Sequence, residues 1–254
     1  MPVVAAVGTT HPLAFAGVTF AMQVLAREGV RPVCVIAGVS AQDARSVLRR
    51  TPLDAATIAA QFDALREAGV GAFHVGALLS TDAVRAVAAG LAAFAGVPVV
   101  VDPVLAATGG DPLADDATVA ALRDVLLPCA TLLTPNLDEA GALLERSVRD
   151  LDAMRDAAPA LRARGARAVL VKGGHLAGDA IDVVSDDAGV RTFRTPRIAN
   201  VLRGTGDLLA ATIAASLASG ATLDDAIVHA HTRVADAIAH GVLFAGTRVA
   251  PETR

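Results

Sequence analysis

The sequence predicts a three-layer α/β/α fold built around one mainly parallel β-sheet. Short β-rich runs recur along the chain, and Ala-, Leu- and Arg-rich segments with helical spacing separate them. Gly or Pro precedes most of the β-rich runs. Strands that alternate with helices are typical of a parallel sheet covered by helices on both faces. No linker-like segment interrupts the 254 residues, so we expect a single domain over residues 1–254.

The elements can be assigned in chain order. Residues 1–8 form an apolar run that leads into Thr9 rather than a cleavage site, so they predict a first strand and a cytoplasmic protein. Ser80, Asn136, and Ser147 with Asp150 have the residue types of helix N-termini. Further strands are predicted at 33–36, 72–75, 97–101, 131–134 and 168–172, with helical segments at 65–68, 83–94 and 151–164.

The pattern changes after residue 172. Residues 181–185 and 190–195 flank a turn-like Asp-Asp-Ala-Gly sequence and predict an antiparallel hairpin at one side of the sheet. Two helices follow, at 208–219 and 223–240, and Gly220 and Thr222 mark the break between them.

Composition excludes several classes of function. The formal charge is −4, acids and bases are mixed along the chain, and Trp and Tyr are absent, so a nucleic-acid partner is not expected. Apolar residues make up 54% of the chain, but the longest apolar stretch is interrupted by Gly96 and Pro98, which argues against a membrane span. Cys34 and Cys129 lie in hydrophobic surroundings and are predicted to be buried and inert.

The sequence Gly204-Thr205-Gly206-Asp207 precedes a strongly helical run and is a candidate phosphate site. Glycines at a helix start let backbone N–H groups converge on an anion, and the helix dipole adds to the attraction. Beside a phosphoryl group, Asp207 could accept the proton of an attacking hydroxyl. The alternative for this string alone is an ordinary loop in which Asp207 caps the helix.

Three other strand ends carry polar residues. Lys172 with Gly173, Gly174 and His175 closes one predicted strand, Asn136 and Glu139 follow another, and Asp102 follows a third. The carboxyl ends of parallel strands open onto one edge of the sheet, where anionic ligands bind. Asn136 and Glu139 could organise a hydrated Mg²⁺ or could form only a capping box, and Lys172 could equally be a solvated lysine.

Together, these motifs resemble those of the hydroxymethylpyrimidine and phosphomethylpyrimidine kinases of thiamine synthesis, relatives of pyridoxal kinase in the ribokinase-like superfamily. The resemblance runs in order through Val39-Ser40-Ala41-Gln42, Val101-Asp102-Pro103-Val104 with Thr108-Gly109-Gly110, Leu133-Thr134-Pro135-Asn136-Leu137-Asp138-Glu139-Ala140, Val171-Lys172-Gly173-Gly174-His175-Leu176 and Gly204-Thr205-Gly206. Several motifs in a fixed order are far more specific than any one of them.

The resemblance implies an ATP- and Mg²⁺-dependent kinase and assigns roles to individual residues. Gln42 would contact the heterocycle, with Gly8 and Asp102 as further candidate substrate contacts. Lys172 would contact the ATP phosphates, with Gly173 beside it. Asn136 and Glu139 would serve magnesium and phosphate, and Asp102 is a second candidate metal ligand. Gly204, Thr205 and Gly206 would form the anion hole next to the catalytic Asp207.

Two departures from the family pattern concern the acceptor more than the chemistry. The pyrimidine kinases usually have Cys at the position of Asp207. Ribokinases and many pyridoxal kinases have Asp there, as this chain does. The first loop of the family is rich in Ser and Gly and is followed by an Asp, whereas here residues 8–17 read GTTHPLAFAG and Ala21 stands near the position of that acid. The apolar loop predicts tolerance of a bulkier or less polar ring.

Competing functions remain at this point: a pyridoxal-type kinase, or a ligand-sensing relative that has lost turnover. The expected partner is a small heterocyclic alcohol, without nucleic acid or membrane, and relatives are often homodimers. His229 and His231 are two apart on a helix and point to different faces, which disfavours a zinc site with His240. His74 is predicted to be a satisfied core residue, and Arg203 either touches phosphate or is exposed.

Overall fold

The computed structural model describes residues 1–174 and 178–251. Within them, nine strands form one sheet in the order β3-β2-β1-β4-β5-β6-β7-β8-β9. The six central strands, β2-β1-β4-β5-β6-β7 in sheet order, pair in parallel. At the two sides of the sheet, β3, β8 and β9 pair antiparallel. The strands are β1 (Val3–Thr10), β2 (Arg31–Gln42), β3 (Val47–Pro52), β4 (Val70–Val75), β5 (Val99–Val101), β6 (Leu132–Leu133), β7 (Ala168–Val171), β8 (Ala180–Asp186) and β9 (Gly189–Thr195).

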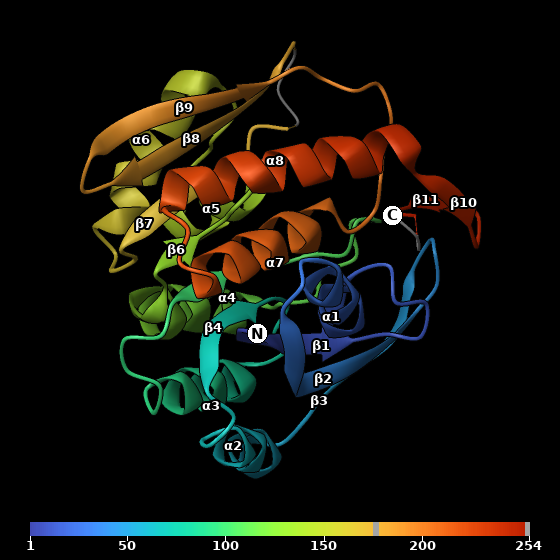
Figure 1. The fold of residues 1–254 in the computed structure, drawn as a ribbon, viewed down its shortest axis with the longest axis vertical. Coiled ribbons are helices and arrows are strands. Elements are labelled where there is room, and N and C mark those ends of the chain that lie inside the picture. The colour runs from blue at the N-terminus through green and yellow to red at the C-terminus, as the bar shows by residue number, and fades with distance from the viewer. Residues whose placement is uncertain (175–177, 252–254) are drawn as a thin grey trace.

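Helices cover both faces of this sheet (Figure 1). On one face lie α2 (Ala55–Ala64), α3 (Thr81–Leu91), α4 (Asp116–Ala121), α5 (Leu137–Leu144) and α6 (Leu151–Arg162). On the other face lie α1 (Gly17–Arg27), α7 (Thr205–Ala218) and α8 (Leu223–His240). A π-helical turn, Leu122–Leu126, and a 3₁₀ turn, Leu127–Cys129, continue α4, and a small hairpin of β10 (Val242–Phe244) and β11 (Thr247–Val249) follows α8.

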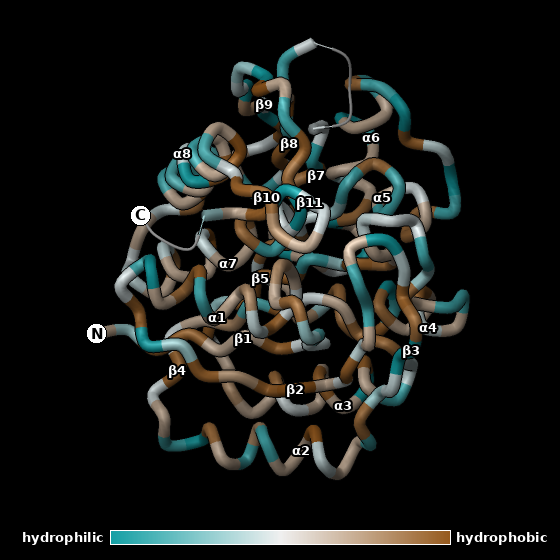
Figure 2. Tube along the Cα trace, turned by 90° about the vertical axis from the view of Figure 1, so that its right-hand side faces the viewer, coloured by the Kyte–Doolittle hydropathy of each residue, from teal (hydrophilic) through white to brown (hydrophobic). Residues whose placement is uncertain are grey.

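The alternation of side chains along the central strands creates two cores. Ala5 and Val7 of β1 face the α2 to α6 side, whereas Val4 and Ala6 face α1, α7 and α8. Because successive side chains of a strand point to opposite faces, each apolar strand contributes to both cores. Figure 2 shows the result as strands coloured mainly hydrophobic inside helices that alternate between hydrophilic and hydrophobic.

The predicted three-layer architecture is confirmed, with every predicted strand present and the hairpin and α8 in their predicted places. The helix predicted at 65–68 is wrong. That segment forms turns after the end of α2. The helix itself is α2, which Asp54 caps and whose buried residues Ile58 and Phe62 lie one turn apart. Neither α1, which begins at Gly17 without a side-chain cap, nor the polar edge strand β3 is predicted from the sequence.

Smaller differences concern individual residues. Asp150, not Ser147, caps α6 through the Ala153 N–H. Cys34 and Cys129 are free and half-buried rather than fully buried, and burial raises the pKa of both thiols, which favours the unreactive protonated form. Within the described residues, no helix combines the length and the apolar character that a membrane crossing requires.

Candidate active site

Three polar residues lie at the carboxyl ends of neighbouring parallel strands. Asp102 follows β5, Thr134 follows β6 and Lys172 follows β7. The backbone N–H of Asp102 donates to Val75, and a parallel bridge pairs Asn136 with Lys172, so the ladder continues slightly beyond the strands. The sheet therefore brings together side chains that lie up to 70 residues apart in the sequence, at the edge where ligands of open α/β folds bind.

Lys172 sits between two carboxylates. Its Nζ atom lies 2.6 Å from Oδ1 of Asp102 and 3.9 Å from Oε2 of Glu139. Thr134 donates from Oγ1 to the same oxygen of Asp102 at 3.2 Å. Burial by itself lowers the pKa of the Lys172 ammonium, but Asp102 and Glu139 outweigh burial and raise that pKa above its ordinary range. Lys172 therefore carries a fixed positive charge at this edge.

Asn136 and Glu139 form a reciprocal capping box at the start of α5. The Glu139 N–H donates to Oδ1 of Asn136 at 2.9 Å, and the Asn136 N–H donates to Oε2 of Glu139 at 2.7 Å. Burial raises the pKa of Glu139 to about 7, with Lys172 acting against burial and Asp102 with it. The capping interpretation of these two residues is correct, and it leaves Oε1 of Glu139 without a role in the cap.

The N-terminus of α7 lies against the Lys172–Asp102 pair. Gly204 is the N-cap residue, with φ of 79° and no side-chain cap. A methyl group at Gly206 would lie 2.8 Å from Oδ2 of Asp102 and 3.3 Å from Nζ of Lys172. The first intrahelical bond joins the Leu208 N–H to Gly204, so the preceding N–H groups have no partner within the helix. Glycine at these positions keeps the helix dipole open to an anion.

Asp207 occupies the third position of α7 and does not cap it. Its Oδ2 atom accepts the Gly17 N–H at 2.9 Å, which ties α7 to the start of α1. Its Oδ1 atom is buried without a hydrogen-bond partner among residues 1–174 and 178–251 and lies 3.7 Å from Nε2 of His74. Burial raises the pKa of Asp207, and the electrostatic effect of the nearby His74 ring is the largest influence that lowers it. The alternative that Asp207 serves only as a helix cap is therefore wrong.

Gly173 lies deeper than its neighbours. Its N–H donates to Oδ1 of Asp182 at 2.8 Å, and a methyl group there would lie 2.0 Å from the Ile181 carbonyl oxygen. The N–H is therefore already engaged, and Gly173 allows β7 and β8 to approach closely. His175, which the motif included, lies outside the described residues. Oδ2 of Asp182 is in turn 2.8 Å from Nε2 of His231 on α8.

Apart from Asp102, the predicted acceptor residues fall into two places. Gly8 lies within the buried part of β1, and a methyl group there would lie 3.1 Å from the carbonyl oxygen of Ala77, close to Gly76, which borders Asp207. Gln42 ends β2 and lines a small hollow on the outer side of the site. The other residues that line this hollow are Asp43, Arg45, Ser46, Val47, Ala107, Gly109, Asp111 and Arg203.

Arg203 lies between this hollow and the glycine-rich start of α7. It donates to the Ala44 carbonyl, and its guanidinium carbon lies 5.2 Å from the centre of the Phe15 ring. Phe15 also packs on His11, with ring centres 4.7 Å apart. Arg203 is thus half-buried between three segments rather than exposed, and its contact with phosphate stays a prediction.

Sequence reasoning missed two residues beside Asp207: Gly17, whose N–H holds the carboxylate, and His74. The prediction that His74 is a satisfied core residue is wrong in one respect, because both of its ring nitrogens lack hydrogen-bond partners within the described residues. A buried histidine in an apolar strand was the available signal. By contrast, His229 contacts Glu28 and His231 contacts Asp182, on separate elements.

The donor set at the strand ends fits a hard cation. Mg²⁺ takes oxygen ligands, and proteins usually hold it through one or two carboxylates together with substrate phosphates. Asp102 and Glu139 supply two carboxylates beside the same lysine. Within the described residues no group of three or more acidic, His or Cys side chains is gathered closely enough to hold a metal alone, so phosphate oxygens would complete such a shell.

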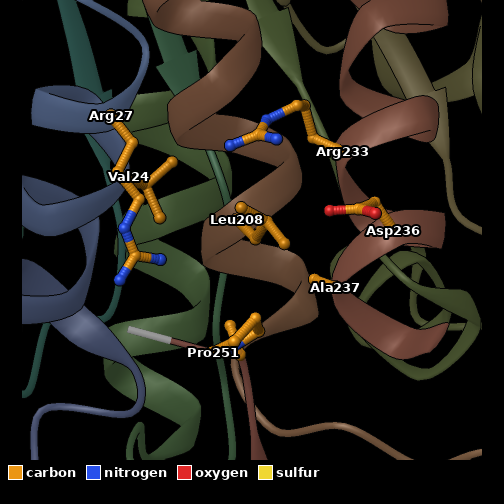
Figure 3. Close-up of a pocket in the computed structure, with 8 residues that line it drawn as sticks. Val24, Arg27, Leu208, Arg233, Asp236, Ala237 and Pro251 are labelled. Atoms are coloured by element: carbon orange, nitrogen blue, oxygen red, sulfur yellow. The ribbon is translucent and has the colours of Figure 1, made fainter. Parts of the chain in front are cut away.

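A second hollow lies away from these residues. It opens between α1, α7, α8 and the segment after β11, where Val24, Leu208, Arg233 and Pro251 point toward one another (Figure 3). None of the predicted site residues lines it. Leu208 follows Asp207 directly, but helical geometry turns the two side chains apart, so this hollow faces away from the Asp207 carboxylate.

Comparisons with known proteins agree with this arrangement. Residues 12–251 match the family described as phosphomethylpyrimidine kinase. The chain is 37% identical over 233 residues to the hydroxymethylpyrimidine/phosphomethylpyrimidine kinase of Streptomyces coelicolor, covering 91% of this chain and 86% of that protein. It is 40% identical over 207 residues to the thiamine biosynthesis bifunctional protein ThiED of Geobacter sulfurreducens, covering 80% of this chain but only 42% of that longer protein.

A solved structure has the same fold over nearly the whole chain. The pyridoxal kinase of Bacillus subtilis, determined as an ADP complex, superposes with a TM-score of 0.90 at 26% identity and covers 99% of this chain and 97% of that one. The sheet order, the helices on both faces and the glycine-rich start of α7 are thus set in a ribokinase-like kinase fold. The chain belongs to the phosphomethylpyrimidine kinase family and is an ATP-dependent phosphotransferase.

Proposed function

We propose that this protein transfers the γ-phosphoryl group of ATP to the hydroxymethyl group of a substituted pyrimidine or to the monophosphate of that compound. The observation that carries the proposal is the buried, unpartnered Oδ1 atom of Asp207 beside the open N-terminus of α7. A carboxylate oxygen left free next to an anion-binding helix end is suited to accept a hydroxyl proton during phosphoryl transfer.

The transfer requires little covalent help from the protein. Oδ1 of Asp207 takes the proton as the acceptor oxygen forms its bond to phosphorus and the bond from phosphorus to the ADP oxygen breaks. The N–H groups at the start of α7, which Gly204 and Gly206 leave accessible, hold the equatorial oxygens of the phosphoryl group. Lys172 places a permanent positive charge on the same side, where negative charge develops.

The remaining residues bind and orient. Asp102 and Glu139 would hold Mg²⁺, which neutralises phosphate charge when it is bound. Gln42 would pair with the ring nitrogen and amino edge of the pyrimidine, and Phe15 and Leu13 would make the facing wall apolar. Asn136 orients Glu139 through the capping box, and Thr134 orients Asp102.

A direct assay tests the proposal. Purified protein is incubated with ATP, Mg²⁺ and, separately, hydroxymethylpyrimidine, its monophosphate, pyridoxal or no acceptor, and ADP and phosphorylated product are both measured. We expect transfer to a pyrimidine alcohol that stops in EDTA and returns with excess Mg²⁺. ADP formation that ignores the acceptor, or efficient use of pyridoxal with none of either pyrimidine, would overturn the proposed acceptor class.

We further propose that residues 1–254 act as one kinase domain, that the protein works in the cytoplasm and that it forms a homodimer. The family match over residues 12–251 supports the first point. Sedimentation analysis at micromolar concentration tests the last, because a dimer has twice the mass of the 25.6 kDa chain.

A further inference from the structure

His74 is a buried polar residue in a largely apolar layer. It lies in β4 with only 1% of its surface exposed, and its backbone pairs with Ala6 on one side and Val100 on the other. Its neighbours Phe73 and Val75 face the α2 to α6 core, so the imidazole faces α7. Neither ring nitrogen has a hydrogen-bond partner among residues 1–174 and 178–251. Burial of an imidazole without partners is unfavourable, so its position requires an explanation.

The ring is directed at the free side of Asp207. Nε2 of His74 lies 3.7 Å from Oδ1 of Asp207, while Oδ2 of the same carboxylate is held by the Gly17 N–H. Gly76 leaves room beside the pair, because a methyl group there would lie 3.4 Å from Oδ1 and 3.7 Å from Cε1 of His74. The two oxygens thus have different neighbours: one is fixed by the backbone, and the other faces a ring nitrogen and the site.

We propose that His74 is a positioning residue for Asp207: its Nε2–H group holds the carboxylate so that one lone pair of Oδ1 faces the acceptor hydroxyl. The inference rests on the proposed role of Asp207. A separation of 3.7 Å is longer than a hydrogen bond, but catalytic hydrogen bonds are often long before substrate binds and shorten in the complex. A small rotation of the Asp207 side chain closes this gap without moving the backbone.

Burial, rather than the charges around the pair, favours a neutral imidazole as the donor. Burial lowers the pKa of His74, and Lys172 acts in the same direction, whereas Asp207 and Asp102 act against it. A neutral ring with its proton on Nε2 can donate to Oδ1 without neutralising the carboxylate, so Asp207 remains able to take the acceptor proton.

The test compares substitutions that keep or remove the donor. In His74→Gln the amide nitrogen can stand near the position of Nε2, in His74→Asn the amide is too short to reach Asp207, and His74→Leu carries no donor. Thr212→Val is the control, because Thr212 is another buried residue of this layer whose hydroxyl lacks a partner within the described residues. Each is measured for kcat, the KM for ATP and thermal midpoint, alone and in combination with Asp207→Asn.

Loss of the donor should lower kcat by about 10- to 100-fold, the usual effect of removing a hydrogen bond to a charged group. We expect that loss in His74→Leu and His74→Asn, with the KM for ATP unchanged and kcat largely retained in His74→Gln and Thr212→Val. In the Asp207→Asn background, the His74 substitutions should have no further effect on kcat, because residues that act through one another are not additive.

Equal losses in Gln, Asn and Leu variants, or a loss that persists undiminished in the Asp207→Asn background, would overturn the positioning role. If His74→Leu does not fold, the comparison of His74→Gln with His74→Asn decides by the same criterion. Failure of the proposed function has a separate signature, because Asp207→Asn alone would then keep near-normal kcat.

Discussion

The ammonium of Lys172 lies 2.6 Å from the carboxylate of Asp102, across the ends of two strands that flank β6. Asp102 is 2% exposed, so this pair links two charges that the sheet removes largely from water. Both charges also border the start of α7, where Gly206 approaches them closely. The pair is therefore part of the fold and of the proposed phosphate site at once, and substitutions there should affect stability and binding together.

Removal of one member of this pair should be strongly destabilising. Lys172→Met leaves the buried Asp102 without its cation, and we expect the free energy of unfolding to fall by about 3 kcal/mol. ATP affinity should fall as well, since a positive charge at the phosphate site is lost. Urea denaturation and nucleotide titration measure the two effects. The double variant Lys172→Met with Asp102→Asn should recover much of the stability but not the affinity, and recovery of both would contradict a phosphate contact.

Asp207→Asn should separate catalysis from binding. The amide keeps the shape of the side chain and removes the basic oxygen, so kcat should fall by roughly 10²–10⁴-fold with ATP affinity unchanged. A variant with near-normal kcat would contradict the role as a base.

The same substitution should stabilise the fold at neutral pH. Burial raises the pKa of Asp207, so above the unfolded-state pKa of about 4 the ionised carboxylate disfavours the folded state. The stability advantage of Asn over Asp should therefore increase as pH rises from about 4 toward neutrality. Thermal midpoints of both proteins at several pH values test this, and an advantage that shrinks with pH would contradict it.

Gln42→Leu should weaken acceptor binding more than ATP binding. Gln42 lines the hollow with Arg203 and Gly109, and neither Lys172 nor the capping box lines it. Loss of one hydrogen bond to the ring should weaken acceptor binding by about 1–3 kcal/mol. The ratio of the two apparent affinities is the measurement, and an equal effect on both substrates would assign Gln42 a structural role.

The two glycines at the start of α7 should respond differently to alanine. Gly204 has φ of 79°, and a methyl group there would lie 2.3 Å from the Phe15 carbonyl oxygen, so Gly204→Ala should lower stability by about 1–3 kcal/mol or more. The methyl group of Gly206→Ala meets only the ends of the Asp102 and Lys172 side chains. We therefore expect Gly206→Ala to lose activity while its thermal midpoint falls less than that of Gly204→Ala. A larger fall of the thermal midpoint in Gly206→Ala than in Gly204→Ala would contradict this placement of the anion site.

His11 should make the fold sensitive to mild acid. Burial lowers the pKa of His11 to about 4, against about 6.5 in the unfolded chain. Between these values the unfolded state binds more protons, so stability should fall as pH drops through this window, by on the order of 2 kcal/mol. The free energy of unfolding, measured from pH 7 to pH 4, should depend less steeply on pH in His11→Phe than in the unchanged protein. Equal pH dependence in both proteins would exclude His11 as the source of the acid sensitivity.

The sequence alone determined the layers, the parallel sheet and the motifs. Alternation of apolar runs with helical segments depends only on local spacing, so the strands from β4 to β7 and the helix over residues 223–240 were predictable. The glycines before Asp207 and the polar residues at strand ends were readable for the same reason. Residues 65–68 were misassigned and β3 was missed because short segments with weak periodicity take their structure from their neighbours.

Only the tertiary structure decided which of these residues meet. Gly17 and Asp207 are 190 residues apart, and no local pattern indicates that a backbone N–H of α1 fixes one oxygen of that carboxylate. The same holds for His74. Its sequence pattern is that of an ordinary core strand, and only the packing of α7 on the sheet places Asp207 opposite the ring. Local spacing sets which face a side chain takes, but its partner is set by how helices pack on the sheet, which depends on long-range contacts that no short stretch of sequence contains.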